Sequence, residues 1–323
     1  MNFFNSFTKN KPWFAFGCDL IDFFKRLYKY NASINTEQSK NKFEYTILRQ
    51  CHVIEKGLSM RCPHIKFGLD NAEDVSNKLL QYQEKYGASN PIFLDYPIET
   101  LHAYLTYAQN HGWNSITISS NLEKLEKKEL HSAKTYGIKN LYKKDITDQS
   151  NFFETFLKER HSIRYYKKEV PPQELLDKAL YLAQLTPSAC NRQCWKVHQF
   201  NQDNCTKLLK WQEGARGFET EPTVAFLITS DLQAFLSYEP FQAYIDGGMY
   251  AMSLIYALHS LGLGTIPLSC GFGHAKLKRL RSEFNIPENE VPIEIVATGL
   301  LLDSFNVALS KRKPISQVVI HHD

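Results

Sequence analysis

The chain has 323 residues, of which 43% are hydrophobic and 22% are charged, and its formal net charge is +4. This composition is typical of a globular protein with a large core, the length predicts two domains, and a mildly basic balance does not by itself indicate a nucleic-acid partner. The seven cysteines have no regular spacing, which argues against a disulfide framework and favours a reducing, cytoplasmic location.

Residues 1 to about 34 are rich in aromatic side chains, which we expect to dock on something because so many rings would not stay in water. The apolar stretch from Phe14 to Phe24 carries Asp19 and Asp22 and is too short to span a bilayer. It also lacks the layout of a signal peptide. An interfacial helix that touches a membrane or a partner stays open, but a terminal helix packed on its own domain is the favoured interpretation.

Helical periodicity predicts helices over 36–60, 70–87 and 95–112, with Gly57 as a stop and Asp70 or Asn71 as a cap. The run 115–120 is read as a short β-like segment or a loop, and 121–143 as a charged helix. Glutamates interrupt that basic run, so nucleic-acid binding is a weak hypothesis and we expect none. The first 150 residues are therefore predicted to be a mainly helical extension, with a linker near 145–151.

The segment from Cys51 to Met60 places His52, Glu55 and Lys56 on one helical face. Such a group either faces a site or forms a plain surface pair with a capping histidine, and the structural interpretation is favoured. No second pair of cysteine or histidine completes a zinc pattern around Cys190 and Cys194, so no metal site is expected. Those two thiols are read as small buried hydrophobes rather than reactive groups.

The stretch from Arg160 to Trp195 organises the second half of the chain. Two arginines and a serine within five residues, Arg160 to Arg164, offer a phosphate forked donors and positive charge. A helix that begins near Pro171 separates this group from a second polar loop, 187–195, whose side chains suit a heterocycle or a polyol. Solvated loops with paired arginines are the alternative, but the combination at this spacing favours an anionic cofactor.

Further along, we predict a strand at 196–200, a turn at 201–204, a helix at 205–212 and a buried central strand at 224–229. The segment 240–261 reads as a helix that is apolar nearly all round, so either the domain core or a dimer partner must bury it. A loop at 265–273, a helix at 275–284 and a strand at 293–297 follow. The end, 316–320, is read as an arm that pairs with a second subunit.

Several segments, taken together, resemble the FMN-dependent nitroreductase family, in the same order along the chain. They are Arg-His-Ser-Ile-Arg-Tyr-Tyr at 160–166, Thr-Pro-Ser-Ala-Cys-Asn-Arg-Gln-Cys-Trp at 186–195, the segments 244–249 and 261–267, and the basic tail 311–314. The resemblance covers about residues 152–323. It implies an α+β fold with a nitroreductase-like central mixed or antiparallel sheet flanked by helices, so we place the FMN-binding domain at 151–323 and the helical extension at 1–150.

The resemblance also implies the site. Arg160, Ser162 and Arg312 would face the FMN phosphate, and Arg164 would stabilise negative charge on the reduced ring. A homodimer with FMN at its interface is implied, in which the second subunit contributes the loop. A further loop would bring backbone N–H groups to the flavin, with Gly271 closest. The implied cofactor contacts are Arg160, His161, Ser162, Arg164, Pro187, Ser188, Ala189, Asn191, Pro267, Leu268, Cys270, Gly271 and Arg312.

The chain departs from the family at three positions. Ser310 replaces one basic residue of the tail motif, Arg216 stands near the place of a pyrimidine-edge asparagine, and Ser269–Cys270 lacks an acidic residue. The function implied is an FMN-dependent oxidoreductase that passes hydride from NAD(P)H through flavin to a small acceptor, with no side chain required as a catalytic acid. The alternative is a flavin-binding regulatory or partner protein whose pocket the N-terminal extension covers.

Overall fold

The computed structural model describes residues 12–34, 39–60, 66–87, 91–125, 137–138, 142–143, 148–310 and 312–322. Its helices are α2 (Pro12–Tyr30), α3 (Lys40–Leu58), α4 (Leu69–Tyr86), α5 (Pro91–Asn110), α6 (Ile116–Leu125), α7 (Ser150–Glu159), α8 (Gln173–Ala183), α9 (Gln202–Leu209), α10 (Gln242–Ser260) and α11 (His274–Phe284). Its strands are β1 (Trp195–Asn201), β2 (Val224–Asp231), β3 (Leu263–Ser269) and β4 (Glu290–Leu300).

A four-stranded antiparallel sheet forms the centre of the C-terminal half, in the order β1-β2-β4-β3. Strand β2 is buried at every position, as expected for a central strand with an apolar sequence. Because successive side chains point to opposite faces, Val224, Phe226 and Ile228 pack on one side of the sheet, and Ala225 and Leu227 on the other.

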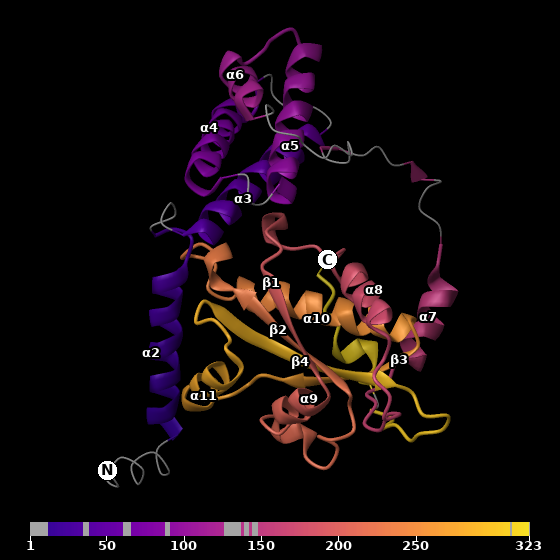
Figure 1. The fold of residues 1–323 in the computed structure, drawn as a ribbon. Helices are drawn as coiled ribbons and strands as arrows, with labels where there is room; N and C mark the ends of the chain where they lie inside the picture. Colours follow the sequence, from indigo (N-terminus) through magenta and orange to yellow (C-terminus); the bar gives the residue numbers. More distant parts are fainter. Residues whose placement is uncertain are drawn as a thin grey trace.

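Helices cover both faces of this sheet (Figure 1). Apolar residues of α8 and α10 pack on the face of Phe226, and those of α9 and α11 on the face of Leu227. The predicted α+β class, with an antiparallel sheet flanked by helices, is therefore confirmed. The helix α10 also leaves Tyr244 and Ile245 exposed, together with Phe241 just before it, so the core of one chain buries only part of its apolar surface.

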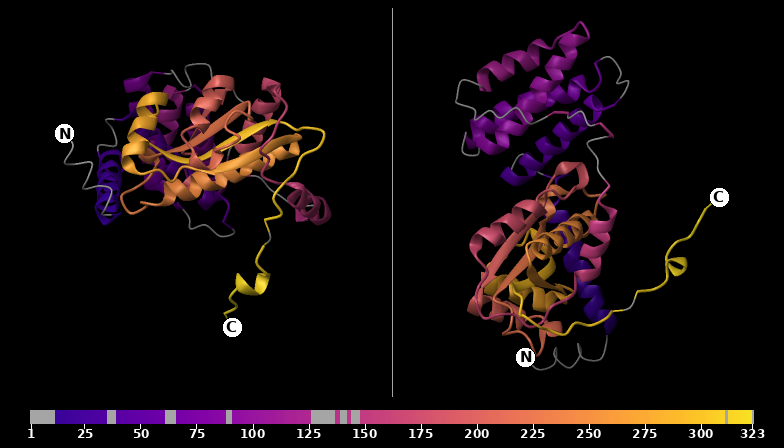
Figure 2. Two further views of the ribbon diagram at one scale, coloured as in Figure 1. Left: turned by 90° about the horizontal axis from the view of Figure 1, so that it is seen from below. Right: turned by 90° about the vertical axis from the view of Figure 1, so that its right-hand side faces the viewer.

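Helices α3 to α6 pack around a separate apolar core above the sheet (Figures 1 and 2). The stripe predicted from the sequence, which includes Ile47, Cys51 and Ile54, is fully or almost fully buried in it. Gly57 is the last but one residue of α3, so the helix ends one residue after the predicted stop. A Cβ at Gly57 would lie 2.1 Å from the ring of Phe67, so the glycine permits close packing.

Two further elements of the helical region differ from the sequence prediction. The run 115–120 is not β-like, because Ser115 precedes α6 and its hydroxyl accepts from the N–H of Ile118, as a helix-capping serine does. The charged helix predicted over 121–143 is helical at its start, where α6 runs to Leu125, and residues 126–136 lie outside the described residues, but residues 137–138 are not helical. The linker predicted near 145–151 lies partly outside them as well.

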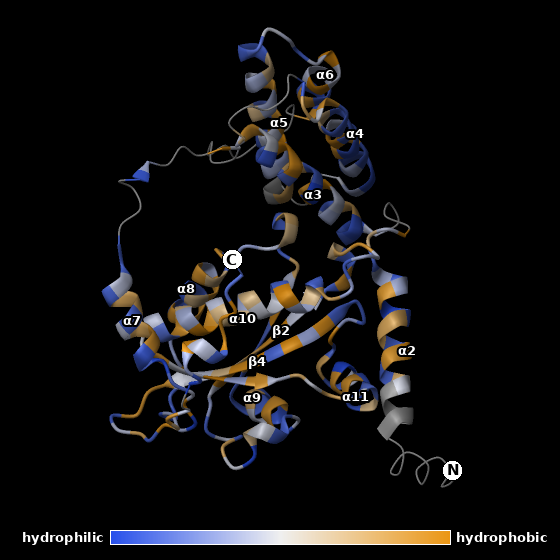
Figure 3. Ribbon diagram, turned by 180° about the vertical axis from the view of Figure 1, so that it is seen from behind, coloured by the Kyte–Doolittle hydropathy of each residue, from blue (hydrophilic) through white to orange (hydrophobic). Residues whose placement is uncertain are grey.

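Helix α2 leaves the helical bundle and lies along the sheet domain beside α11, with polar and apolar bands along its length (Figure 3). The ring of Phe23 stacks on Phe241, the residue before α10, at 6.1 Å, and the guanidinium of Arg26 donates to the carbonyl of Glu290 at 3.0 Å. The start of α3 also contacts the sheet domain, because the Asn41 amide donates to the Asp231 carboxylate. The described part of the aromatic N-terminal segment thus docks on the domain, while Phe3, Phe4 and Phe7 lie outside the described residues.

Two local predictions in the sheet domain were wrong. The turn expected at 201–204 is already helix, since α9 begins at Gln202, whose own φ is positive. The loop expected at 265–273 is strand β3 as far as Ser269. The resemblance implied a loop there, but the segment forms β3, an edge strand, which tolerates Pro267 because its missing N–H need not be paired.

The described tail from Asp303 to His322 leaves the domain and extends away from it, apart from the short turn Ile315–Gln317 (Figure 2). Leu309, Ile315 and Ile320 in this tail are at least 78% exposed. None of the described helices is long and apolar enough to cross a membrane. The division of the chain near residue 150 stays a prediction, because α2 and α3 contact the sheet domain.

Candidate functional site

The first polar stretch of the candidate site follows α7 directly. Arg160 caps that helix with an extended backbone, and the chain then runs beside β3, where the Ile163 N–H donates to the Thr265 carbonyl at 2.9 Å. Ile163 and Tyr166 are buried, and the Tyr166 hydroxyl donates to the Ile163 carbonyl at 2.6 Å. These two buried residues fix the backbone of the stretch, and its polar side chains face outward.

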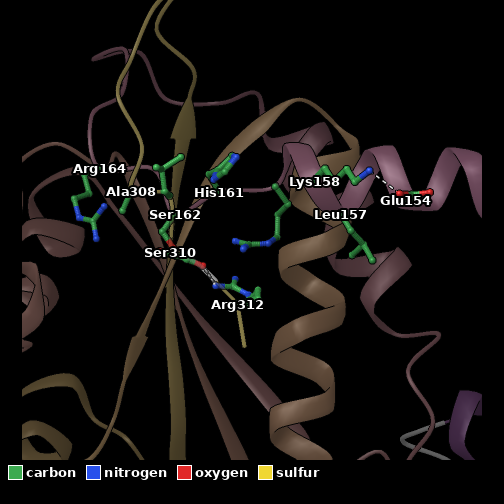
Figure 4. Close-up of a pocket in the computed structure, with 11 residues that line it drawn as sticks. Glu154, Leu157, Lys158, His161, Ser162, Arg164, Ala308, Ser310 and Arg312 are labelled. Atoms are coloured by element: carbon green, nitrogen blue, oxygen red, sulfur yellow. Dashed lines mark hydrogen bonds and ion pairs between the residues drawn. The ribbon is translucent and has the colours of Figure 1, made fainter. Parts of the chain in front are cut away.

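Those side chains line one cavity of about 570 Å³ (Figure 4). Its wall is built from α7, the stretch after it and the C-terminal tail, and includes Arg160, His161, Ser162, Arg164 and Arg312. Arg164 lies at one end of the group and the Glu154–Lys158 pair at the other (Figure 4). The structure thus brings together Arg160, Ser162 and Arg312, which the sequence analysis assigned to a phosphate, with His161 and Arg164, two further predicted cofactor contacts.

The cavity is strongly positive. Among its described lining residues the carboxylate is Glu154, which is paired with Lys158 at 2.5 Å. Burial lowers the pKa of the nearby His259, and the charge of Arg160 lowers it further. His259 bonds the Phe156 carbonyl at 3.2 Å, which fits the interpretation as a satisfied histidine. Such a surplus of unpaired positive charge suits an anion such as a phosphate.

Arg164 also places the Gly214–Phe218 segment next to the site. Its guanidinium lies 5.9 Å from the centre of the Phe218 ring, a cation–π distance. This is the segment in which the sequence lacks the expected asparagine. Arg216 within it is exposed, and Gln212 at its start bonds the Ser269 carbonyl at 2.9 Å. The segment is therefore held between the first polar stretch and the end of β3.

The second polar loop, 187–193, has an unusual backbone. Cys190, Asn191 and Gln193 all have positive φ values, of 51°, 51° and 49°. Non-glycine residues rarely adopt this region, so surrounding contacts must hold the loop there. Ser188 supplies one contact, because its hydroxyl accepts from the Gln193 N–H at 2.9 Å. The Ala189 N–H donates to the buried carboxylate of Asp246 at 3.1 Å.

Arg192 supplies the main anchor of this loop. Its side chain is 1% exposed and forms two bonds to the Glu239 carboxylate, at 2.7 and 2.8 Å. It also donates to the carbonyls of Ala189 and Ala234, both at 2.9 Å, and its guanidinium lies 4.9 Å from the Phe235 ring centre. The sequence analysis did not single out this residue. An arginine in a polar loop carries no signal of burial, since only the fold reveals Glu239.

Within one chain, the loop and the first cavity do not share a wall. Pro187 is exposed, Ser188, Ala189 and Asn191 are half-buried, and none of the four lines the cavity of Arg160. The Asn191 amide instead interacts with the phenol of Tyr96 in α5. The loop thus lies beneath the helical region, and a role in the same site would require a second chain.

The remaining predicted residues lie along β3. Pro267 is half-buried and Leu268 is buried in the core. Cys270 and Gly271 follow the strand and line a second cavity of about 280 Å³, whose other walls include Phe23 of α2 and Tyr244. Thr265 bonds the first polar stretch, and since strands rise about 3.3 Å per residue, the end of β3 at Ser269 lies roughly 13 Å from Thr265.

The His52 segment and Cys194 have structural roles. Glu55 accepts from the Tyr96 hydroxyl at 2.7 Å and from the Gly137 N–H at 3.3 Å, which fits the structural interpretation of the His52 segment. Burial raises the pKa of Cys194 to about 12, as expected for an unreactive buried thiol. Among the residues described, no group of three histidine, cysteine or acidic side chains is placed to hold a metal ion.

Comparison with known proteins gives a match at this first stretch. The model of the nitroreductase family matches residues 157–215. Residues 157–215 are a nitroreductase-family segment. It contains the first polar stretch, α8 and the whole second loop, so the resemblance drawn from the sequence is confirmed there.

Two curated relatives bear the name NADH dehydrogenase/NAD(P)H nitroreductase. The protein of Methanothermobacter thermautotrophicus is 28% identical over 144 residues, which is 44% of this chain and 74% of the relative. The protein of Archaeoglobus fulgidus is 29% identical over 141 residues, which is 43% of this chain and 80% of the relative. Both matches thus leave more than half of this chain without a counterpart.

Solved structures show similar coverage. A nitroreductase family protein from Streptococcus pneumoniae is 20% identical, covers 53% of this chain and 100% of its own, and has a TM-score of 0.45. A nitroreductase structure in complex with FMN from Desulfovibrio desulfuricans is 20% identical, covers 55% of this chain and 99% of its own, and has a TM-score of 0.46.

Proposed function

We propose that this protein is an FMN-dependent oxidoreductase of the nitroreductase type, which takes hydride from NAD(P)H and passes it to a small acceptor. The nitroreductase-family segment and the names of the two relatives support an oxidoreductase. The observation that supports FMN as the cofactor is the cavity of about 570 Å³. Arg160, Ser162 and Arg312 line it together, and its carboxylate, Glu154, pairs with Lys158 instead of the arginines. The residues present fit a phosphate.

In this proposal each residue acts by binding or orienting. Arg160 and Arg312 pair with the phosphate and Ser162 donates a hydrogen bond to it, while His161 adds a further polar contact. Arg164, held against the Phe218 ring, lies where it can stabilise negative charge on a reduced ring. The flavin supplies the hydride transfer itself. An elongated mononucleotide could extend from Ser162 along β3 toward Cys270 and Gly271.

The loop 187–191 completes the site only in a dimer, because its residues do not line this cavity within one chain. Exposed apolar side chains on and just before α10, on α7 and in the tail support such an assembly; they are Phe241, Tyr244, Ile245, Phe152, Phe153, Leu309 and Ile315. A dimer interface would remove such exposed apolar side chains from water. We therefore propose a homodimer with FMN at its interface, to be checked by light scattering.

The deciding experiment measures FMN on the full chain. Purified protein should be yellow and release FMN on denaturation, and NADH or NADPH should bleach it without oxygen. The variants Arg160→Gln and Arg312→Gln should each weaken FMN binding by about tenfold or more, since each removes charge-assisted bonds. Lys168→Gln is the matched control, because Lys168 pairs with Glu221 at 3.0 Å outside the cavity. Colourless protein that takes up no added FMN would refute the proposal.

The alternative is a flavin-binding regulatory or partner protein. One observation favours it: Phe23 of α2 lines the same cavity as Cys270 and Gly271, so the N-terminal region covers the loop that would meet the flavin ring. This alternative predicts bound FMN that neither NADH nor NADPH reduces. The bleaching experiment therefore separates the two functions, and rapid reduction would exclude the regulatory one.

A further inference from the structure

A second positive cavity lies between α2 and α11, away from the first polar stretch. It has a volume of about 420 Å³, and its walls include Arg26 of α2 and Lys278 and Arg281 of α11. The guanidinium groups of Arg26 and Arg281 both donate to the carbonyl of Glu290, each at 3.0 Å. Two cations that share one acceptor must lie side by side, which is unfavourable unless an anion joins them.

The carboxylates of this cavity are already engaged. Asp22 pairs with His274 at 3.0 Å, and Glu288 pairs with Lys29 at 3.0 Å and accepts from Tyr30. Among the described residues, none of these carboxylates forms an ion pair with Arg26, Lys278 or Arg281. Arg26 and Arg281 therefore bond to backbone carbonyls, while the charges of Asp22 and Glu288 act on them without a direct ion pair.

Arg281 shows the consequence of this arrangement. Its Nε is buried and has no hydrogen-bond partner, an uncommon state for a charged donor in a folded protein. Burial and the charge of Arg26 lower the pKa of Arg281 to about 10. Two forked guanidinium groups beside a lysine match the oxygens of a phosphate or a carboxylate.

The cavity lined by Cys270 and Gly271 indicates which chemical group such a ligand has besides its oxyanion. It shares the lining residues Asp22, Arg26 and His274 with the positive cavity, so the two cavities are neighbours. Its volume is about 280 Å³, and Phe23, Tyr244 and Phe272 form its apolar walls. A polar head at the arginines therefore adjoins room for a small aromatic body.

We propose that α2 and α11 form a binding site for a small molecule with an oxyanion at Arg26 and Arg281 and a compact aromatic body between Phe23 and Phe272. The site uses α2, which lies outside the nitroreductase-family segment. It does not require bound FMN, so its failure would leave the proposed function standing, although its aromatic part adjoins Cys270 and Gly271, toward which the proposed flavin extends. Because Gly271 lines the same apolar cavity, such a ligand would sit beside the end of β3.

The test is hydrogen exchange on the full chain with inorganic phosphate, phenyl phosphate and benzoate. Binding should slow exchange in α2 and α11, a local readout that separates this site from the cavity of Arg160. Phenyl phosphate should act at about tenfold lower concentration than inorganic phosphate, because its ring is buried. Benzoate distinguishes a carboxylate head from a phosphate head.

Arg281→Gln should raise the concentration needed for protection by about tenfold or more. Arg279→Gln is the matched control on the same helix, since Arg279 lies 5.6 Å from the Trp211 ring centre and lines neither cavity. Arg26→Gln takes the place of Arg281→Gln in this test if Arg281→Gln does not fold. Absence of protection by all three compounds, or protection that persists in both Arg281→Gln and Arg26→Gln, would overturn the site. Equal potency of phenyl phosphate and inorganic phosphate would refute the claim that the site binds an aromatic group.

Discussion

Replacing Glu239 by glutamine should test the anchor of the second loop. The change leaves the 1%-exposed guanidinium of Arg192 without the carboxylate that accepts its two bonds at 2.7 and 2.8 Å. Removing one partner of a buried ion pair costs about 3–5 kcal/mol. The Glu239 side chain is 20% exposed, so solvent screens part of the loss and we expect the lower value, about 3 kcal/mol.

Urea unfolding followed by circular dichroism measures this loss of unfolding free energy, provided that the slope with denaturant is unchanged. Glu213→Gln is the control, because Glu213 is 83% exposed and pairs with Lys276 at the surface, so no measurable change is expected. Hydrogen exchange should also quicken in residues 187–193 of Glu239→Gln. A loss below about 1 kcal/mol would refute the view that this ion pair holds the loop.

The same pair predicts a dependence on pH. Burial alone would raise the pKa of Glu239, but hydrogen bonds from Arg192 and from the Leu236 N–H outweigh it, so the folded-state pKa lies below the usual value of 4.5. A carboxyl with a lowered pKa contributes stability that is complete above its unfolded value. That contribution is lost as the pH falls through the folded-state pKa of Glu239. The difference in unfolding free energy between wild type and Glu239→Gln should therefore become smaller in acid.

Two further predictions concern packing around the site. Gly247→Ala should destabilise the fold by about 1–3 kcal/mol, because its Cβ would lie 2.6 Å from Ile293. Gly248→Ala should instead stabilise the fold by roughly 0.5–1 kcal/mol, because its Cβ would meet nothing within 4 Å. Equal urea midpoints of the two variants would contradict this. Tyr166→Phe should cost about 1 kcal/mol in urea unfolding, since it removes the 2.6 Å bond to the Ile163 carbonyl, and an unchanged midpoint would show that this bond does not hold the first stretch.

Much of the fold could be predicted from local patterns. The apolar run of β2 and the long apolar helix α10 are where the sequence predicted them, because burial on both faces requires apolar side chains at nearly every position. Gly57, predicted as a helix stop, lies one residue before the end of α3 and also makes room for Phe67. An error arose at 265–269, where the resemblance implied a loop but the chain forms the edge strand β3, on which a proline is tolerated.

The sequence by itself determined the two polar stretches, the helix between them and the family they resemble, because these features depend on short spacings within one segment. Only the tertiary structure decided which charges meet. It joined Arg192 to Glu239 and placed Arg26 beside Arg281. A charged side chain shows no sign in sequence of a partner far along the chain, because only the packing of helices on the sheet fixes that distance.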